Sequence, residues 1–169
     1  RNPDYRAVDL VLFDIDGTLT QSQSIDTEIY LRSLSAVFGF EGVDPDWSTY
    51  RHTTDPGIVH ELCASRLGRA PTPAENSAFR AHFVDAIAME AAHNPFQQIA
   101  GAGEALSYLA RSPSCCVGLA TGSWSSSARR KMYSAGMQYD AFASASADDA
   151  MSRTSIMQIA IDRVVGQND

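Results

Sequence analysis

The sequence contains one long apolar run that ends in an acidic turn, and this run limits the fold more than any other feature. Residues 8–15 read VDLVLFDI and are followed by Asp16-Gly17-Thr18. A nearly continuous run of branched apolar residues indicates a strand buried in a parallel sheet, because a strand with one solvated face alternates apolar and polar residues. The glycine then allows the backbone to turn sharply. We therefore expect a buried strand that carries an acidic turn at its carboxyl end.

Two further apolar segments have the character of strands, residues 115–120 and the weaker 141–146. Each is followed by a helical pattern, over residues 126–135 and 152–165. Strands that alternate with helices indicate βαβ units and a parallel sheet. We predict an α/β fold, a Rossmann-like three-layer sandwich built on a parallel sheet.

A helical insertion separates the first two strands. Residues 20–95 carry three helical patterns and no strand pattern. Asp55, followed by Pro56, is expected to cap the second of these helices, and Thr72 to open a capping box at the start of the third. We predict that this segment forms a separate helical domain inserted into a discontinuous sheet domain. The two parts of the sheet domain are residues 1–19 and 96–169.

Polar joints flank the insertion at residues 20–24 and 93–95. Two linkers between a sheet domain and a helical insertion are what a hinged lid requires. The alternative is that both joints are plain surface loops.

Charge and composition limit the function. Twenty acidic residues against thirteen basic ones give a net charge of −7, whereas a non-specific nucleic-acid binder needs a basic face. The chain has no apolar run of about 18 residues that would span a membrane. Its three cysteines lack metal-binding spacing and are expected to be reduced thiols, as in a cytoplasmic protein. We expect a small-molecule partner and neither a nucleic acid nor a membrane.

The acidic turn supplies two carboxylates where open α/β sheets bind ligands, just beyond the carboxyl ends of the strands. Asp14 and Asp16 with a backbone carbonyl suit a hard cation such as Mg²⁺. The Asp14 carboxylate can attack the phosphorus of a bound phosphate, and Asp16 can protonate the leaving oxygen and later activate a water. The alternative is an ordinary acidic turn.

Residues 13–20, FDIDGTLT, together with the apolar run before them, resemble the first motif of the haloacid dehalogenase superfamily. The resemblance implies that Asp14 is the nucleophile and Asp16 the general acid/base, with Mg²⁺ held by Asp14 and by the Asp16 carbonyl. It also implies that Gly17 and Thr18 help to bind phosphate. Dehalogenases of that superfamily lack the second aspartate, so Asp16 indicates a phosphatase or phosphotransferase.

Two later segments resemble the second and third motifs of the superfamily. Thr121 and Gly122 end the second predicted strand, where a hydroxyl and backbone N–H groups bind a phosphoryl oxygen. Arg153, at the start of the helix after the third strand, stands where the family places its charge-offsetting cation. The alternative cation is Lys131, which lies in a run of basic residues expected on a solvated helix face.

The fourth motif of the superfamily, an acidic pair after a further strand, is absent from the sequence. Asp169 follows no strand and is not assigned as a metal ligand. We expect either a fragment without the remaining strands or a divergent member with a weakened metal site.

The insertion has the position of the helical C1 cap in the phosphoglycolate phosphatase and β-phosphoglucomutase branch. That branch commonly has an aspartate where Gln21 and Ser22 stand here. Cap loops supply substrate contacts in such enzymes, and Thr54 and Asp55 are our candidates. The alternative is that Asp55 only caps its helix.

The resemblance implies a phosphatase that hydrolyses a small phosphorylated metabolite through an aspartyl-phosphate, with Mg²⁺. One alternative is a phosphomutase that returns the phosphoryl group to a sugar. The other is a catalytically impaired binding module, suggested by the absence of the fourth motif.

Overall fold

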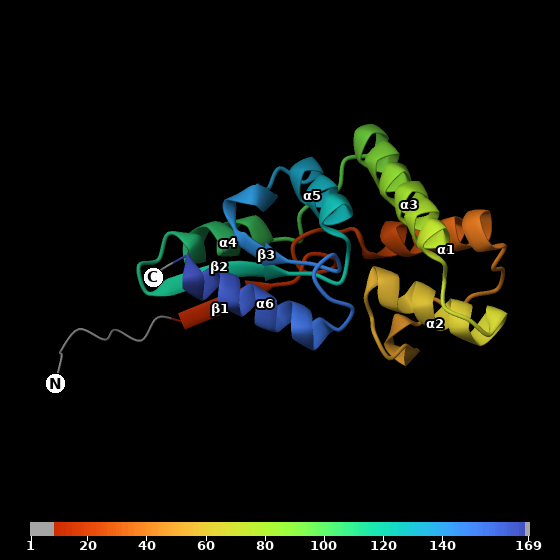
Figure 1. Ribbon diagram of the computed structural model, residues 1–169. Helices are drawn as coiled ribbons and strands as arrows, with labels where there is room; N and C mark the ends of the chain where they lie inside the picture. Colours follow the sequence, from red (N-terminus) through yellow and green to blue (C-terminus); the bar gives the residue numbers. More distant parts are fainter. Residues whose placement is uncertain (1–8, 168–169) are drawn as a thin grey trace.

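A parallel sheet of three strands organises the part of the chain that the computed structural model describes, residues 9–167. The strands are β1 (Asp9–Phe13), β2 (Cys115–Ala120) and β3 (Ala143–Ala145), in the order β1-β2-β3 (Figure 1). Leu12 pairs with Gly118, and Gly118 pairs in turn with Ala143. The three carboxyl ends therefore meet at one edge of the sheet.

Helices cover both faces of this sheet, which confirms the predicted three-layer α/β sandwich. The helices are α4 (Ala102–Ala110) and α5 (Ser125–Ser134), with α6 (Arg153–Gly166) on the opposite face from α4 (Figure 1). The side chains of Ile156, Ala160 and Val164 on α6 are buried. At Gly118 a Cβ atom would lie 2.5 Å from the Val164 side chain, so the glycine allows α6 to pack closely on β2. The sequence analysis had no prediction for α4.

The first strand is less buried than its sequence predicts. Asp9 is exposed and residues 10–13 are only partly buried, while residue 8 of the predicted strand lies outside the described residues. The physical reason is position, since β1 is at the edge of the described sheet and pairs with β2 on one side. The third strand is shorter than predicted because residues 139–141 form a 3-10 helix, η2 (Tyr139–Ala141).

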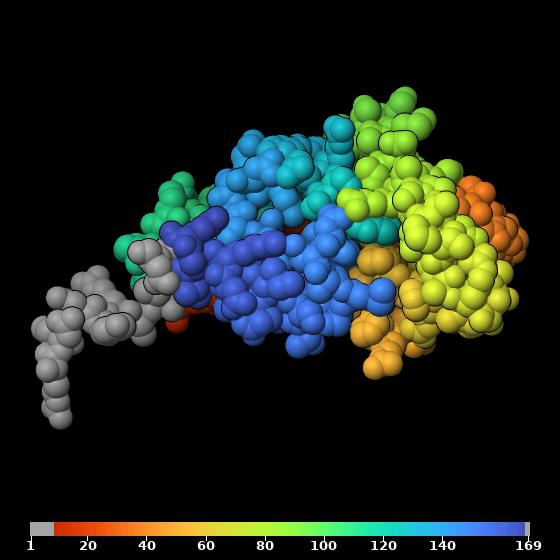
Figure 2. Space-filling view, viewed as in Figure 1, coloured from red at the N-terminus to blue at the C-terminus, as the bar shows by residue number. Residues whose placement is uncertain are grey.

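The insertion is helical throughout and shares its core with the sheet domain. Its elements are α1 (Gln23–Phe38), the 3-10 helix η1 (Trp47–Thr49), α2 (Asp55–Leu67) and α3 (Pro73–His93). Phe79 and Phe83 on α3 each lie 5.9 Å from the ring of Trp124, which precedes α5. Thr72 forms the predicted capping box at the start of α3. The two domains meet closely in the space-filling view (Figure 2).

The two connections between the domains run side by side. The Gln21 N–H donates to the Gln97 carbonyl at 2.8 Å, and the Ile99 N–H donates to the Leu19 carbonyl at 3.0 Å. The two segments that connect the domains therefore pair in antiparallel fashion and lie next to one another. Two adjacent connections are what a hinge between domains requires. The domain boundaries at residues 20 and 95 remain a prediction.

The cysteines 63, 115 and 116 are free. None of the helices in residues 9–167 has the length and the apolar character that crossing a membrane requires. Asp169 lies outside the described residues.

Candidate active site

The loop after β1 is tightly folded and presents both predicted carboxylates. The Ile15 carbonyl accepts the N–H groups of residues 18–20 at 2.9 to 3.2 Å. Gly17 has φ of +75°, a left-handed conformation that other residues adopt only with strain. The loop therefore turns within a few residues and leaves the side chains of Asp14 and Asp16 at the carboxyl end of β1.

Asp14 is paired with the cation predicted from the third motif. The two terminal nitrogens of Arg153 lie 3.2 and 3.3 Å from the two carboxylate oxygens of Asp14. Arg153 begins α6, whose N-cap is Ser152. Both side chains of the pair are more than a third exposed, so a substrate can reach them. A planar guanidinium in this position can grip two oxygens of a phosphate as it now grips the carboxylate.

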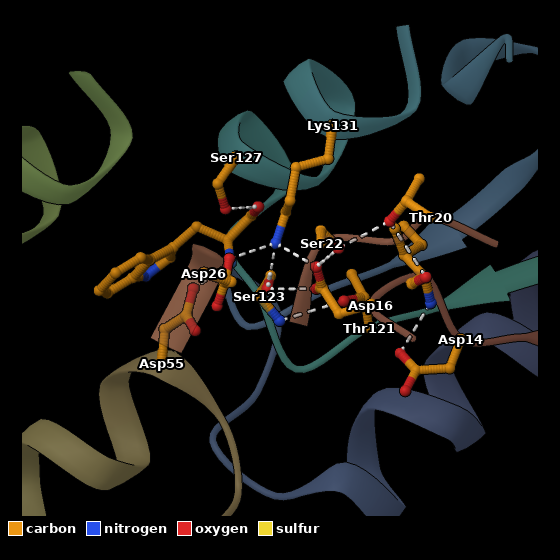
Figure 3. Close-up of polar contacts among 12 residues, drawn as sticks. Asp14, Asp16, Thr20, Ser22, Asp26, Asp55, Thr121, Ser123, Ser127 and Lys131 are labelled. Atoms are coloured by element: carbon orange, nitrogen blue, oxygen red, sulfur yellow. Dashed lines mark hydrogen bonds and ion pairs between the residues drawn. The ribbon is translucent and has the colours of Figure 1, made fainter. Parts of the chain in front are cut away.

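Asp16 points in another direction, toward Lys131 on α5. The Lys131 ammonium lies 2.6 Å from Asp16 Oδ1 and 2.7 Å from Asp26 Oδ1, and it donates to the Ser123 hydroxyl at 3.2 Å (Figure 3). The Lys131 side chain is fully buried. The expectation that Lys131 lies on a solvated helix face is therefore wrong. Its face of α5 meets the cap, and two carboxylates there compensate its buried charge.

Two serine hydroxyls complete the surroundings of Asp16. Ser22 donates to Asp16 Oδ1 at 2.5 Å and Ser123 donates to Oδ2 at 2.9 Å. Burial alone would raise the pKa of the Asp16 carboxyl, but the charge and hydrogen bond of Lys131 and these two hydroxyls outweigh it and hold the pKa below the usual value. The ionised form of the Asp16 carboxyl is therefore the one that this environment stabilises.

Thr54, and not Asp55, caps α2. The Thr54 hydroxyl accepts the N–H of Gly57 at 3.3 Å and donates to the carbonyl of Met151 in the sheet domain at 2.7 Å. The prediction that Asp55 is the N-cap residue of this helix is wrong. The extended backbone that an N-cap residue needs occurs one residue earlier, at Thr54. Thr54 therefore both starts its helix and holds the cap to the sheet domain.

Asp55 is consequently available for contacts across the domain boundary. Its backbone N–H donates to the Gly122 carbonyl at 2.8 Å, and its carboxylate accepts the backbone N–H of Trp124 at 2.9 Å. The alternative that Asp55 does no more than cap its helix is wrong. These bonds fix the carboxylate beside residues 121–124, next to the predicted phosphate site.

Asp26 and Asp55 share a partly dehydrated environment on the cap side. Burial raises the pKa of Asp26 to about 6, with Lys131 opposing the shift and Asp16 adding to it. Burial and the nearby Asp26 raise the pKa of Asp55 well above its usual value, and Lys131 again opposes the shift. The single buried ammonium thus offsets only part of the negative charge that gathers around it.

One cavity of about 200 Å³ joins these groups, between the sheet domain and the cap. Most of the predicted site residues line it; these are Asp14, Asp16, Thr54, Asp55, Thr121, Gly122 and Arg153. Gly17 and Thr18 are exposed and do not line it. The cap adds further lining residues that the sequence analysis did not single out; among them are Gln23, Asp26, Thr27, Tyr30, Trp47 and Thr53.

The position of Asp26 and the burial of Lys131 each had a signal in the sequence. Asp26 follows Ser22 by four residues, so both lie on one face of the first cap helix. Lys131 follows Ala128 by three residues and precedes Ala135 by four, which is the spacing of a buried apolar stripe. A basic residue inside such a stripe indicates a buried cation with acidic partners.

Mg²⁺ is the cation that the resemblance implies, and the donors suit it in kind. The accessible Asp14 carboxylate and the Asp16 carbonyl are hard oxygen donors, and Mg²⁺ takes few protein ligands and keeps several waters. The Asp16 side chain is occupied by Lys131 and two serines. Within residues 9–167 no group of three or more His, Cys, Asp or Glu is placed to hold a metal ion. The magnesium site stays a prediction, with the Asp16 carbonyl as the donor.

The raised pKa of Asp26 gives a prediction for stability. The folded chain binds this proton more tightly than the unfolded chain, whose aspartates titrate near 3.8. The contribution of Asp26 to the free energy of unfolding therefore falls as pH rises from about 4 to about 6. As pH rises through this interval, we expect the free energy of unfolding of the wild type to fall relative to that of the Asp26→Asn variant. Urea unfolding of both proteins at each pH measures the difference.

The control is Asp85→Asn, which changes an exposed acid of α3 in the same cap. Its free energy of unfolding is measured at the same pH values, so that an effect of removing any cap acid can be told from one specific to Asp26. A parallel course of the Asp26→Asn and wild-type curves would contradict the assignment.

Comparison with known proteins agrees with the motifs and the fold. Residues 8–163 match the family described as haloacid dehalogenase-like hydrolase. The chain belongs to that family. The resemblance seen in the sequence is thereby confirmed, and the coarse activity of the family is that of a hydrolase. No protein of curated function matches the chain.

Several solved structures share the fold of this chain. A hydrolase from Pseudomonas syringae superposes with a TM-score of 0.74 at 16% identity, over 93% of this chain and 70% of that one. A protein named as a β-phosphoglucomutase from Bacteroides vulgatus gives 0.68 at 19% identity, over 92% and 63%. A protein named as a phosphoglycolate phosphatase from Lactobacillus plantarum gives 0.58 at 25% identity, over 92% and 70%.

Proposed function

We propose that this haloacid dehalogenase-like hydrolase is a phosphatase that acts on a small phosphorylated metabolite. The observation that carries the proposal is the bidentate ion pair between Asp14 and Arg153. It lies at the carboxyl end of β1 and lines the cavity under the cap. A nucleophilic carboxylate and a forked cation that can hold the phosphate meet there. Family membership and the accessible position of Asp14 support the same conclusion.

The reaction has two steps. A carboxylate oxygen of Asp14 attacks phosphorus, the bond to the leaving oxygen breaks, and an aspartyl-phosphate forms while Asp16, which must first be protonated, gives its proton to the leaving oxygen. Water then attacks the same phosphorus, Asp16 recovers a proton from it, and Asp14 is released. Because Lys131 and two serines stabilise the ionised form of Asp16, the resting arrangement favours the second step.

The phosphate is held from several sides. Arg153 binds its oxygens in place of the Asp14 carboxylate, and the Thr121 hydroxyl and Gly122 lie beside it in the cavity lining. Mg²⁺, held by the Asp14 carboxylate and the Asp16 carbonyl, supplies positive charge that offsets the phosphate when bound. The cap, joined to the sheet domain through Thr54 and Asp55, excludes bulk water and contacts the leaving group.

The direct test is release of inorganic phosphate from p-nitrophenyl phosphate and from a panel of small phosphomonoesters, with Mg²⁺ and with excess chelator. We expect release that depends on Mg²⁺, and a phosphoryl group on the peptide that contains Asp14, found by mass spectrometry of the quenched reaction. Transfer of the phosphoryl group to an added sugar phosphate in place of water would favour the phosphomutase. A chain that neither releases phosphate nor becomes phosphorylated would overturn the proposal.

Gly122 gives a prediction about the joint between cap and phosphate site. A Cβ atom there would lie 2.7 Å from the Thr53 carbonyl oxygen and 3.0 Å from the Arg153 guanidinium carbon. The carbonyl belongs to the backbone and cannot rotate aside, so both the cap loop and the arginine must move. We expect Gly122→Ala to lower kcat/KM for p-nitrophenyl phosphate by roughly tenfold to a hundredfold.

The matched control is Gly166→Ala at the end of α6, where an added Cβ meets nothing within 4 Å. It is expected to keep wild-type kcat/KM. Equal activity of the Gly122→Ala variant and this control would show that the close approach at Gly122 is not needed.

A further inference from the structure

We propose that the cap acids Asp26 and Asp55 make this enzyme select phosphomonoesters whose leaving group is uncharged or cationic. Leaving groups that carry a carboxylate or a second phosphate are rejected. The inference rests on the proposed phosphatase function and names the chemical class of its substrate.

The lining of the cavity is acidic. Four carboxylates line it, those of Asp14, Asp16, Asp26 and Asp55. An anionic leaving group needs a cation as its partner. Among the described lining residues, Arg153 is the single Lys or Arg, and the phosphate also needs it.

Arg153 and Lys131 are both already paired with carboxylates of the site. Arg153 faces Asp14 at 3.2 Å and holds the phosphate end of the substrate. Lys131 is fully buried behind the lining, between Asp16 and Asp26. Arg80 on α3 forms an ion pair with Asp148, with 2.6 Å between its guanidinium nitrogen and the carboxylate oxygen. None of these three cations is left for a carboxylate on the leaving group.

The position of the cap acids relative to Asp14 decides which end of a bound substrate meets them. Asp26 comes from α1 and Asp55 from α2, and both lie on the side of Asp16 away from Asp14 (Figure 3). A phosphate seated at Asp14 and Arg153 directs its leaving group toward this cap side. The leaving group then meets two carboxylates together with neutral polar groups such as Thr27.

The cavity is small enough to confine the leaving group of a bound substrate. The cavity of about 200 Å³ compares with roughly 30 Å³ for each water in the liquid, so it holds a phosphate and a short leaving group. The Asp55 carboxylate is held by the Trp124 N–H and its backbone by the Gly122 carbonyl, so it cannot swing away. A short leaving group with a negative charge is therefore forced against like charge, whereas a hydroxyl or an ammonium gains hydrogen-bond acceptors.

The test uses three phosphomonoesters with leaving groups of equal length. They are 2-hydroxyethyl phosphate, 2-aminoethyl phosphate and 2-phosphoglycolate, which differ in one terminal group. Burial raises the pKa of Asp26 to about 6 and that of Asp55 well above its usual value, so the esters are compared at about pH 9, which favours the ionised form of both acids. With the full chain and saturating Mg²⁺ at that pH, we expect kcat/KM for the hydroxyl and ammonium esters to exceed that for the carboxylate ester by about tenfold or more.

The decisive variant is Asp55→Asn, which keeps the size of the side chain and its ability to accept the Trp124 N–H. We expect the preference against the carboxylate ester to shrink to about threefold or less. Asp85→Asn removes an exposed acid from the same cap and is expected to keep the wild-type preference.

The outcomes separate the two proposals. Failure to hydrolyse any of the three esters and p-nitrophenyl phosphate overturns the phosphatase function, and the selectivity falls with it. Hydrolysis in which the wild type accepts the carboxylate ester as well as the others overturns the selectivity alone. The same conclusion follows if the Asp55→Asn and Asp85→Asn variants show equal preferences.

Discussion

Replacing Asp14 by asparagine is expected to lower kcat for phosphomonoester hydrolysis by roughly 10³-fold or more. The amide oxygen and nitrogen are poor nucleophiles, so no aspartyl-phosphate forms at this position. The asparagine keeps the shape of the side chain, and its oxygen can still accept the Ile15 N–H that now binds Asp14 at 2.9 Å. The fold should therefore persist, with a midpoint of thermal unfolding close to that of the wild type.

The measurement combines steady-state phosphate release with a search for the phosphorylated peptide. The matched control is Asp9→Asn, which changes an exposed aspartate at the other end of the same strand and should leave both readouts unchanged. Turnover close to wild type in the Asp14→Asn variant would remove Asp14 from the role of nucleophile.

Replacing Lys131 by methionine is expected to lower the free energy of unfolding by about 3 kcal/mol, the low end of the cost of breaking a buried ion pair. The substitution leaves Asp16 and Asp26 facing one another without the cation that lies 2.6 and 2.7 Å from them. The low end applies because these two carboxylates keep 19% and 18% of their side-chain surface exposed. Urea unfolding at pH 7 measures the change.

Two further variants make the Lys131→Met experiment specific. Arg130→Met removes the neighbouring exposed cation of the same helix and should change the free energy of unfolding by about 0.5 kcal/mol or less. Adding Asp26→Asn to Lys131→Met removes one of the uncompensated charges and should restore part of the loss. Equal stabilities of the Lys131→Met and Arg130→Met variants would contradict the buried bridge.

Lys131 also shows how a pattern of residue types can mislead. A run of three basic residues is usually a solvated face, and two of the three, Arg129 and Arg130, are indeed exposed. Helical geometry places the third on the face that carries Ala128 and Met132, which is buried against the cap. Its partner Asp26 is 105 residues away in the sequence. Only the closed arrangement of the two domains brings them together.

The start of α2 likewise differs from its prediction by one residue. Both Thr54 and Asp55 are good capping residues, and the sequence does not tell which of them adopts the extended backbone of a cap. The structure assigns the cap to Thr54, and this places Asp55 within the helix, facing the sheet domain. A shift of one residue thus converts a structural acid into a candidate substrate contact.

The sequence by itself determined the α/β order, the helical insertion, the family and the acidic loop that follows β1. Those features depend on local physics: apolar periodicity, turn glycines and capping residues act within a few positions of one another. The tertiary structure alone decided that β1 is a partly buried edge strand of the described sheet, that Lys131 is buried between Asp16 and Asp26, and that the cap adds acids to the cavity. These features depend on which surfaces of the two domains pack against one another. That packing brings charges together and removes water from them, and local sequence patterns do not predict either effect.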